Sequence, residues 1–469
     1  MNTNSGETIQ PASAAIDALR ALHHGPLLLP GAADYDTART VWNAMIDRRP
    51  VLVARCRDAA DVVAGVNFAR EHGLPLSVKG GGHNIAGTAV GEGLMLDLSL
   101  MKEVVVNPEA RTAVAQPGCL LSDVDRATQA HGLAAVLGFI SMTGIAGLTL
   151  GGGFGYLTRR FGWTCDTVLS LEVVTAAGEV VIASETENPD LFWGLRGGGG
   201  NFGVVTRFTY KLYPVGPEII AGAVVWPGAD APAVLDMYRA LTANAPPEQT
   251  VVAVLRKAPP APWLPADIHG KPVVALFVCD TGPLAAAEAR AAAIKSFGTP
   301  VGDVLQRRPY LAQQTLIDGT QPPGRRDYWK SEYLPRLEPE MLTKYIDNAW
   351  RMVSPFAGVT LFPIGGALNE LPEDYSAVGN RDAAFVLAIA AGWERAEDDA
   401  ANIAWVRQTW QALRPFSTGG TYVNFLTEEE GDPRIRDAYG RNYERLIDVK
   451  TRWDPTNLFR ANKNIAPRS

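Results

Sequence analysis

The sequence VKGGGHNIAG, residues 78–87, places three consecutive glycines and a histidine at the end of an apolar segment. The residues leading into it, LPLSV (74–78), are typical of a β-strand. Glycines allow positive φ angles and let a ligand approach the backbone closely, and their successive amide groups can bind anionic oxygens. The segment therefore predicts a strand followed by a turn that holds an anionic group.

Three further glycine clusters occur, with the sequences QPG (116–118), GIAGLTLGGGFG (144–155) and LRGGGGNFG (195–203). Any one of them could form only a tight turn, but several such loops in one half of the chain favour a ligand with more than one phosphate, hence a dinucleotide. The Rossmann fingerprint GxGxxG does not explain them, because the last glycine of GGGFGY comes too early. The P-loop pattern GxxxxGK[ST] does not occur.

His83 follows the three glycines of the first cluster, where the backbone is expected to lie near bound phosphates. A lone histidine is more often structural than functional. The glycines around His83 favour a functional reading, in which the imidazole acts as a base or as a covalent anchor for the cofactor.

Residues 51–215 alternate between short strands and helices, with hairpins expected around Asn107 and at AAGE (176–179). From about 216 to 420, proline-rich joints separate longer strands and helices, which predicts a separate α+β unit. After it, YVNFL (422–426) reads as a strand and residues 432–455 as one helix that begins at an Asp cap and ends at a Pro.

The chain has 469 residues, which suggests two or three lobes, and its net charge of −7 argues against a nucleic-acid partner. The four cysteines are scattered without a CxxC pair, so we expect neither a metal site nor a disulfide framework. Reduced thiols in the cytoplasm are the expected state. The sequence contains no secretory signal pattern and no apolar run long enough for a membrane span, so no membrane partner is expected.

Taken together, the long motifs resemble the FAD-linked oxidases of the berberine bridge enzyme group, which includes the bacterial 6-hydroxynicotine oxidases. The segments that carry the resemblance are residues 78–118, 144–181, 188–206 and 422–467. It covers residues 50–215 and 420–467 strongly and the intervening residues more loosely.

The resemblance implies an α+β protein with a two-subdomain FAD-binding domain of the vanillyl-alcohol-oxidase type. Both chain ends, residues 1–215 and 421–469, would form this domain. Residues 216–420 would form an inserted α+β substrate domain with an antiparallel sheet.

The resemblance also implies how the cofactor is held. The histidine of the family's GGH motif, here His83, would bond covalently to the 8α carbon of the flavin and raise the flavin's reduction potential. The other residues expected to bind FAD are Gly80, Gly81, Gly82, Asn84, Pro117, Gly118, Thr143, Gly147, Gly151, Gly152, Gly153, Val204 and Asn464.

Cys165, in RRFGWTCD (159–166), invites a role as a second tether. Some relatives attach a cysteine to flavin C6, but the matching position here is near Ile140 and no cysteine is close to it. Nucleophilic chemistry at Cys165 is disfavoured, because the neighbouring Asp166 would raise the pKa of the thiol. We therefore expect a single bond through His83, with Cys165 as a small packed residue beside the cofactor.

The family match assigns Tyr422 as a base or orienting group and Asn424 as a polar contact near the substrate. On the expected strand, residues two apart share one face. Tyr439 and Tyr443, four apart on the expected helix, could assist a proton relay or could simply pack that helix.

In the middle of the chain, RRDYWKSEYL (325–334) resembles the family's substrate-domain motif and suggests Tyr328 and Lys330 as pocket residues. Val378 and Asn380 depart from a common pattern of relatives, so no relative's substrate is carried over.

The leading hypothesis is an oxidase that takes a hydride from a CH–OH or CH–NH group of a small molecule and passes electrons to O2. Oxygen access would depend on small side chains around Thr143 and Ile145. A dehydrogenase with another acceptor and a flavin-binding protein without turnover remain alternatives.

Overall fold

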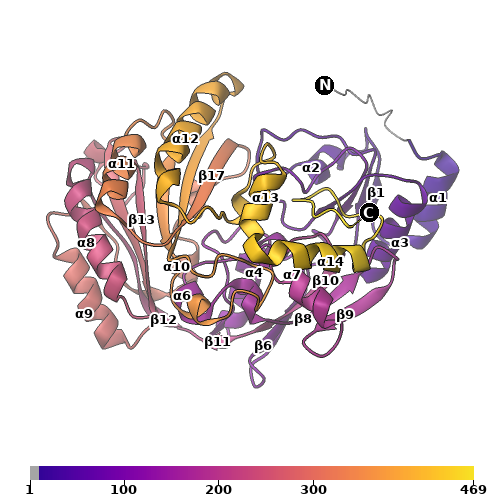
Figure 1. Ribbon diagram of the computed structural model, residues 1–469, viewed down its shortest axis with the longest axis horizontal. Coiled ribbons are helices and arrows are strands. Elements are labelled where there is room, and N and C mark those ends of the chain that lie inside the picture. The colour runs from indigo at the N-terminus through magenta and orange to yellow at the C-terminus, as the bar shows by residue number, and fades with distance from the viewer. Residues whose placement is uncertain (1–9, 469) are drawn as a thin grey trace.

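The computed structural model describes residues 10–468. Figure 1 shows two halves: one is built on a large sheet with helices packed on it, and the other contains the N-terminal strands and the last two helices. The N-terminal and C-terminal segments, far apart in sequence, share the second half. The fold is α+β, as the sequence predicts.

A small sheet carries the first glycine turn. Its strands, in spatial order, are β1 (Leu27–Leu28), β2 (Leu52–Arg55), β4 (Leu94–Asp97) and β3 (Leu76–Lys79). β2, β4 and β3 run parallel, so helix α3 (Ala59–Glu71) provides the crossover between β2 and β3. β3 ends at Lys79, which places Gly80 directly at the carboxyl end of a parallel strand, where ligands of such sheets bind.

The second sheet is antiparallel. Its order is β5 (Val104–Asn107), β6 (Thr112–Ala115), β10 (Val204–Lys211), β8 (Val168–Val174) and β9 (Val180–Ser184). The two predicted hairpins, β5–β6 and β8–β9, both form, and β10 joins them. Two very short strands, β7 (Leu133–Ala134) and β11 (Tyr213–Pro214), pair separately.

The large sheet is antiparallel and has eight strands. They are β12 (Glu218–Pro227), β13 (Gln249–Lys257), β14 (Pro272–Asp280), β15 (Gly302–Asp303), β16 (Gln306–Pro309), β17 (Arg326–Leu334), β18 (Gly358–Pro363) and β19 (Phe385–Trp393). Their order is β15-β12-β14-β13-β18-β19-β17, and β16 also pairs with β12. The expected antiparallel sheet therefore lies within residues 218–393.

Four helices pack on one face of the large sheet, as Figure 1 shows. They are α8 (Ala231–Asn244), α9 (Leu284–Lys295), α11 (Pro339–Ala349) and α12 (Asp399–Leu413). Val251, Ala253 and Leu255 of β13 point toward these helices and belong to the core beneath them. Because side chains alternate along a strand, Val252 and Val254 face the other way, toward the glycine-rich half.

The remaining helices are short or belong to the N-terminal and C-terminal segments. They are α1 (Ser13–Leu22), α2 (Tyr35–Arg39), α4 (Leu121–Gln129), α5 (Ile145–Leu150), α6 (Thr158–Phe161), α7 (Pro189–Leu195), α10 (Tyr310–Gln314), α13 (Asp432–Tyr439) and α14 (Tyr443–Trp453). No helix within residues 10–468 combines the length and apolar character that a bilayer crossing requires.

Two predictions near the C-terminus are wrong. The segment expected to be a strand forms a 3₁₀ turn, Val423–Phe425, closed by the Phe425 amide donating to the Tyr422 carbonyl at 2.9 Å. The helix expected over 432–455 breaks between α13 and α14, because Gly440 has φ of 53° and ψ of −128°, a conformation that favours glycine. Helical periodicity alone does not reveal this break.

Candidate functional site

A cavity of about 390 Å³ lies between the glycine turns and the open face of the large sheet. This volume falls within the range of small-molecule sites. Its walls come from the glycine-rich turns, from five strands of the large sheet and from the C-terminal segment between Tyr422 and Lys463. Two halves of the molecule thus enclose one site.

The first two glycine clusters meet at this cavity through direct backbone contact. A Cβ atom added at Gly81 would lie 2.5 Å from the Gly144 Cα atom and 2.7 Å from its nitrogen. Real Cβ atoms do not approach other atoms so closely, so only glycine allows the turn after β3 to pack against the start of α5. The two glycine runs are therefore one structural unit.

Most of the predicted site residues converge on the cavity. Those that line it are Gly80, Gly81, Gly82, His83, Asn84, Thr143, Gly147, Gly151, Val204, Tyr422 and Asn424. Ile145, suggested for oxygen access, instead lies in the hydrophobic core of this half.

Five predicted cofactor-binding residues do not line the cavity but sit behind it or beside it. The Pro117 carbonyl oxygen lies 2.9 Å from a Cβ built at Gly80, so Pro117 supports that turn from behind. Gly118 lines a second cavity of about 580 Å³, which also involves Gly80 to His83. Gly152 and Gly153 follow α5 with φ angles of 108° and 79°. Asn464 lies beside the lining residues 461–463, and its buried Oδ1 atom has no partner in residues 10–468.

His83 presents a neutral imidazole to the cavity. Its Nδ1 atom lies 3.3 Å from Thr143 Oγ1, and its ring packs against Trp42 with a centroid separation of 4.5 Å. Its Nε2 atom is buried and has no hydrogen-bond partner among the residues that the structure describes. Burial lowers the pKa of His83 to about 4, so the imidazole is uncharged at neutral pH and keeps a nucleophilic lone pair.

Tyr422 and Asn424 come together although the predicted strand does not form. The Tyr422 hydroxyl accepts hydrogen bonds from the Gly153 amide at 3.1 Å and from Asn424 Nδ2 at 2.9 Å. Both lone pairs of the oxygen are then used, and its proton remains free to be donated. Burial raises the pKa of Tyr422 well above its ordinary value, so the hydroxyl stays protonated.

Aromatic packing fixes the position of this hydroxyl. The Tyr422 ring lies nearly parallel to that of Trp163, at 5.8 Å and 10°, and meets Phe154 and Phe425 edge to face at 4.9 Å each. The side chain has little freedom to leave this arrangement. The Tyr422 hydroxyl therefore occupies a fixed position in the cavity wall.

Cys165 is fully buried in the same aromatic cluster but does not line the cavity. Burial, followed by the nearby Asp166, raises the pKa of its thiol, so the reactive thiolate is disfavoured. Ile140 lines the cavity, and no cysteine of the chain does. These positions agree with a packing role for Cys165.

Of two other predicted pairs, the structure places one residue of the first pair at the cavity and neither residue of the second. Tyr439 lines the cavity with a buried hydroxyl that lacks a partner within the described part of the chain, whereas Tyr443 does not line the cavity. Tyr328 and Lys330 point away from the cavity, toward Glu429, and the residue between them, Trp329, lines it instead. The motif therefore identified the correct strand, but the suggested residues lie on its other face.

The C-terminal segment supplies lining residues that the sequence did not single out, among them Phe459, Ala461, Asn462 and Lys463. The buried ammonium of Lys450 holds this segment in place. It donates to the Asn201 carbonyl at 2.8 Å, to Asp454 Oδ2 at 2.7 Å and to the Phe459 carbonyl at 2.9 Å. One lysine thus joins the third glycine turn to the end of the chain.

The features of the cavity fit an elongated polar ligand such as FAD. Three buried polar atoms in its lining have no protein partner among residues 10–468, namely His83 Nε2, Tyr439 OH and Asn462 Oδ1. Such atoms normally have partners, and a bound ligand would provide them. Gly147 and Gly200 also line the cavity, and a Cβ at either would meet no atom within 4 Å.

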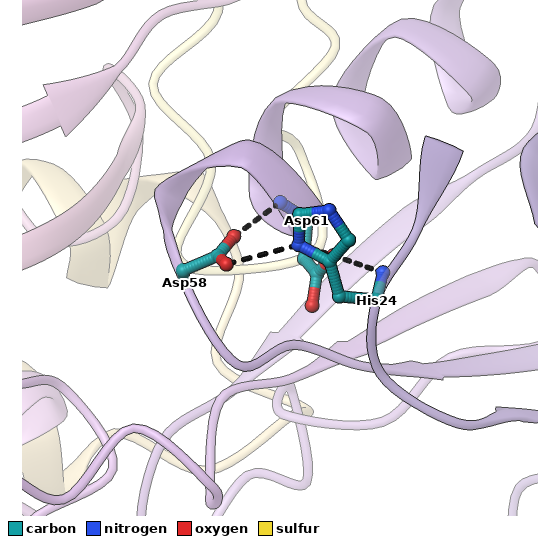
Figure 2. Close-up of side chains that lie close together, drawn as sticks. All are labelled: His24, Asp58 and Asp61. Carbon is teal, nitrogen blue, oxygen red and sulfur yellow. Dashed lines mark hydrogen bonds and ion pairs between the residues drawn. The ribbon is translucent and has the colours of Figure 1, made fainter. Parts of the chain in front are cut away.

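A cluster outside the cavity lining has the residue types of a metal site. One ligating atom from each of His24, Asp58 and Asp61 lies within 4.8 Å of the others, where the chain after α1 meets the start of α3 (Figure 2). However, the Asp61 carboxylate already accepts backbone amides of His24 at 2.6 Å, Gly25 at 3.1 Å and Arg57 at 2.9 Å. Asp58 caps α3 by accepting the Asp61 amide. These hydrogen bonds give the cluster a structural role.

Two glycine substitutions are expected to separate folding from cofactor binding. Gly81→Ala should lower the melting temperature of the protein, because the overpacked contact with Gly144 costs about 1–3 kcal/mol. Gly147→Ala should not lower the melting temperature of the apoprotein, since the new methyl group meets open space and alanine favours a helix by about 1 kcal/mol over glycine. Gly147→Ala should also reduce the amount of FAD bound per chain, which is measured by visible absorbance. Full FAD content in Gly147→Ala would show that the cofactor does not lie against this residue.

Comparisons with known proteins agree with this geometry. Residues 50–184 match the family model of an FAD binding domain, and residues 421–466 match the family described as berberine and berberine like. An FAD-linked oxidoreductase of Dictyostelium discoideum is 30% identical over 91% of each chain. The (R)-6-hydroxynicotine oxidase of Paenarthrobacter nicotinovorans is 30% identical over 94% of this chain and 97% of its own. The crystal structure of 6-hydroxy-D-nicotine oxidase from Arthrobacter nicotinovorans has a TM-score of 0.83 at 27% identity, covering 95% of this chain and 98% of that one.

Proposed function

Because this chain belongs to the berberine bridge enzyme family of FAD-linked oxidoreductases, we propose that it holds FAD covalently through His83 and oxidises a small metabolite at a CH–OH or CH–NH group. FAD binding and oxidoreductase chemistry are properties of the family. The covalent bond, the class of substrate and dioxygen as electron acceptor are the proposed additions.

The observation that carries the proposal is the convergence of His83 and Tyr422 on one cavity. They come from opposite ends of the chain and offer complementary chemistry. His83 offers an uncharged nitrogen next to the glycine turn, and Tyr422 offers a hydroxyl proton. A protein that only stored a flavin would have no need for the second group.

A flavin bound here would supply a two-electron acceptor for the hydride of the substrate. Tyr422 donates its proton in a hydrogen bond to the oxygen or nitrogen of the substrate and so orients the C–H bond. Asn424 and the Gly153 amide hold that hydroxyl in place. The raised pKa of Tyr422 favours this orienting role over that of a general base.

Attachment at His83 has a defined balance of atoms and electrons. The bond would join an imidazole nitrogen of His83 to the 8α carbon, with one hydrogen lost from each partner. Dioxygen would take up both hydrogens and leave as hydrogen peroxide. The low pKa of His83 supports the reaction, because protonation would remove the lone pair that forms the bond.

The proposal includes a division of the chain. Residues 1–215 and 421–469 form the FAD-binding domain, and residues 216–420 form the substrate-binding domain. The Lys450 contacts, which join the C-terminal segment to the third glycine turn, support the first assignment. The eight-stranded sheet within residues 218–393 supports the second.

The proposed location is the cytoplasm. The four unpaired, buried cysteines are consistent with the reducing setting of a cytoplasmic enzyme.

The test is an oxygen-electrode screen of primary and secondary alcohols and uncharged amines against the purified protein. We expect at least one compound to consume O2 and produce an equal amount of peroxide. If a compound bleaches the flavin but only an artificial dye reoxidises it quickly, the protein is a dehydrogenase and the acceptor assignment is wrong.

A further inference from the structure

The wall that the large sheet contributes to the cavity contains one charged side chain, Arg256. The lining residues from this sheet are Val252, Val254 and Arg256 on β13, Phe277 on β14, Trp329 on β17, Thr360 and Phe362 on β18, and Ala388 and Ala390 on β19. Among residues 10–468, no aspartate or glutamate lines the cavity. A charged side chain that faces a largely apolar cavity is costly to bury unless a group of opposite charge pairs with it.

The Arg256 guanidinium has no acidic partner in the described part of the chain, since no carboxylate oxygen lies within 4.0 Å of it. Its one hydrogen bond runs from Nε to the Lys257 carbonyl at 3.3 Å, which leaves both terminal nitrogens unused. The nearby charge is that of Arg325, which is also positive. Burial lowers the pKa of Arg256 to about 10, so the side chain is still charged at neutral pH.

The strand register describes the space beside this charge. Arg256 pairs with Gly358, Gly358 pairs with Ala390, and Ala390 pairs with Trp329. Directly paired residues share one face of a sheet, so a single row across four strands reads Arg, Gly, Ala, Trp. With strands about 4.8 Å apart, the two ends of the row are about 14 Å apart along the sheet. The two smallest residues leave a shallow floor between a cation and an indole ring.

Asp327 does not neutralise this row. It lies on β17 two residues before Trp329, hence on the same face, but it does not line the cavity. Its Oδ1 atom accepts the Trp329 indole N–H at 3.4 Å. The positive charge of Arg256 is therefore available to a ligand.

We propose that the substrate is a flat, largely apolar carboxylate, whose anionic group pairs with Arg256 and whose body lies over Gly358 and Ala390 toward Trp329. The two unused terminal nitrogens match the two oxygens of a carboxylate. This inference rests on the proposed function, because it names the substrate class of the same site.

Calorimetric titration of the holoenzyme with 2-naphthoate and with its neutral isostere 2-naphthamide tests the proposal. The two probes share their shape and differ in charge, so their ratio of affinities reports the contribution of the negative charge of the ligand. We expect 2-naphthoate to bind about ten- to a hundredfold more tightly. Equal affinities, or no binding of 2-naphthoate at millimolar concentration, would overturn the proposal.

Substitutions at Arg256 test whether this residue causes the preference for 2-naphthoate over 2-naphthamide. Arg256→Gln should abolish it, and Arg256→Lys should keep part of it. The matched control is Lys257→Gln, which removes a positive charge from the next residue. The Lys257 side chain does not line the cavity and donates to the Val353 carbonyl at 3.3 Å. This control variant should keep the full preference. A preference that survives Arg256→Gln would overturn the proposal. Binding is measured without turnover, so the result does not depend on whether peroxide forms or how the flavin is attached.

Discussion

Replacing Tyr422 with phenylalanine is expected to lower kcat/KM by about a hundredfold while FAD stays bound. Phenylalanine keeps the aromatic packing against Trp163 and Phe154 but removes the hydroxyl proton that Tyr422 offers to the substrate. The loss should appear mainly in kcat, because the hydrogen bond orients the reacting C–H bond more than it holds the substrate. Rapid-reaction measurement of flavin reduction gives the rate of this step directly.

A structural effect must be separated from this chemical one, because the substitution also leaves the Gly153 amide without its acceptor. Tyr210→Phe is the matched control. The Tyr210 hydroxyl is equally buried and lies 2.7 Å from Thr149 Oγ1 on α5, but it does not line the cavity. We expect Tyr210→Phe to lower only the melting temperature. Equal rates of flavin reduction in wild type and Tyr422→Phe would remove Tyr422 from the mechanism.

Replacing His83 with alanine is expected to release the flavin into the supernatant when the protein is precipitated with acid. The variant should still bind FAD reversibly, because the glycine turns remain. Its flavin potential should fall, and each 30 mV of a two-electron potential changes the equilibrium by about tenfold. We therefore expect kcat to fall by about tenfold or more, with the midpoint potential measured in the same preparation.

Cys165→Ala is the control for His83→Ala, since Cys165 is the residue that the sequence offers as a second tether. Its buried thiol does not line the cavity, so we expect the flavin of this variant to stay with the acid-precipitated protein. If His83→Ala retained the flavin, or if Cys165→Ala lost it, the assignment of the covalent bond to His83 would be wrong.

Much of the glycine-rich half could be predicted from sequence because its signals are local. A strand followed directly by Gly80, Gly81 and Gly82 can only turn, and hairpins such as β5–β6 depend on neighbouring residues. The position of His83 follows from the same turn. These elements therefore appear where the sequence places them.

Predictions failed where distant contacts decide the structure. YVNFL has the composition of a strand, but it does not pair with a strand among the described residues, and packing of Tyr422 against Trp163 and Phe154 holds it in a turn instead. Tyr328 and Lys330 were assigned to the wrong face, because register across the sheet decides which alternate residues of β17 meet the cavity.

Some residues of the site carry no motif. Trp42 lies in a segment without a recognisable pattern and reaches His83 only through the fold. Arg256 did leave a signal, because a charged residue follows two valines in the alternating series Val252, Val254, Arg256 of β13. That alternation could have identified it as a residue on a functional face.

The measurement that tests the central claim most directly is peptide mapping of the wild-type protein after acid precipitation and proteolysis. We predict that the protein pellet stays yellow, that the intact mass exceeds the sequence mass by one FAD, and that the added mass lies on the one peptide that contains His83. A colourless pellet with an unmodified mass, or flavin on a cysteine-containing peptide that lacks His83, would contradict the account.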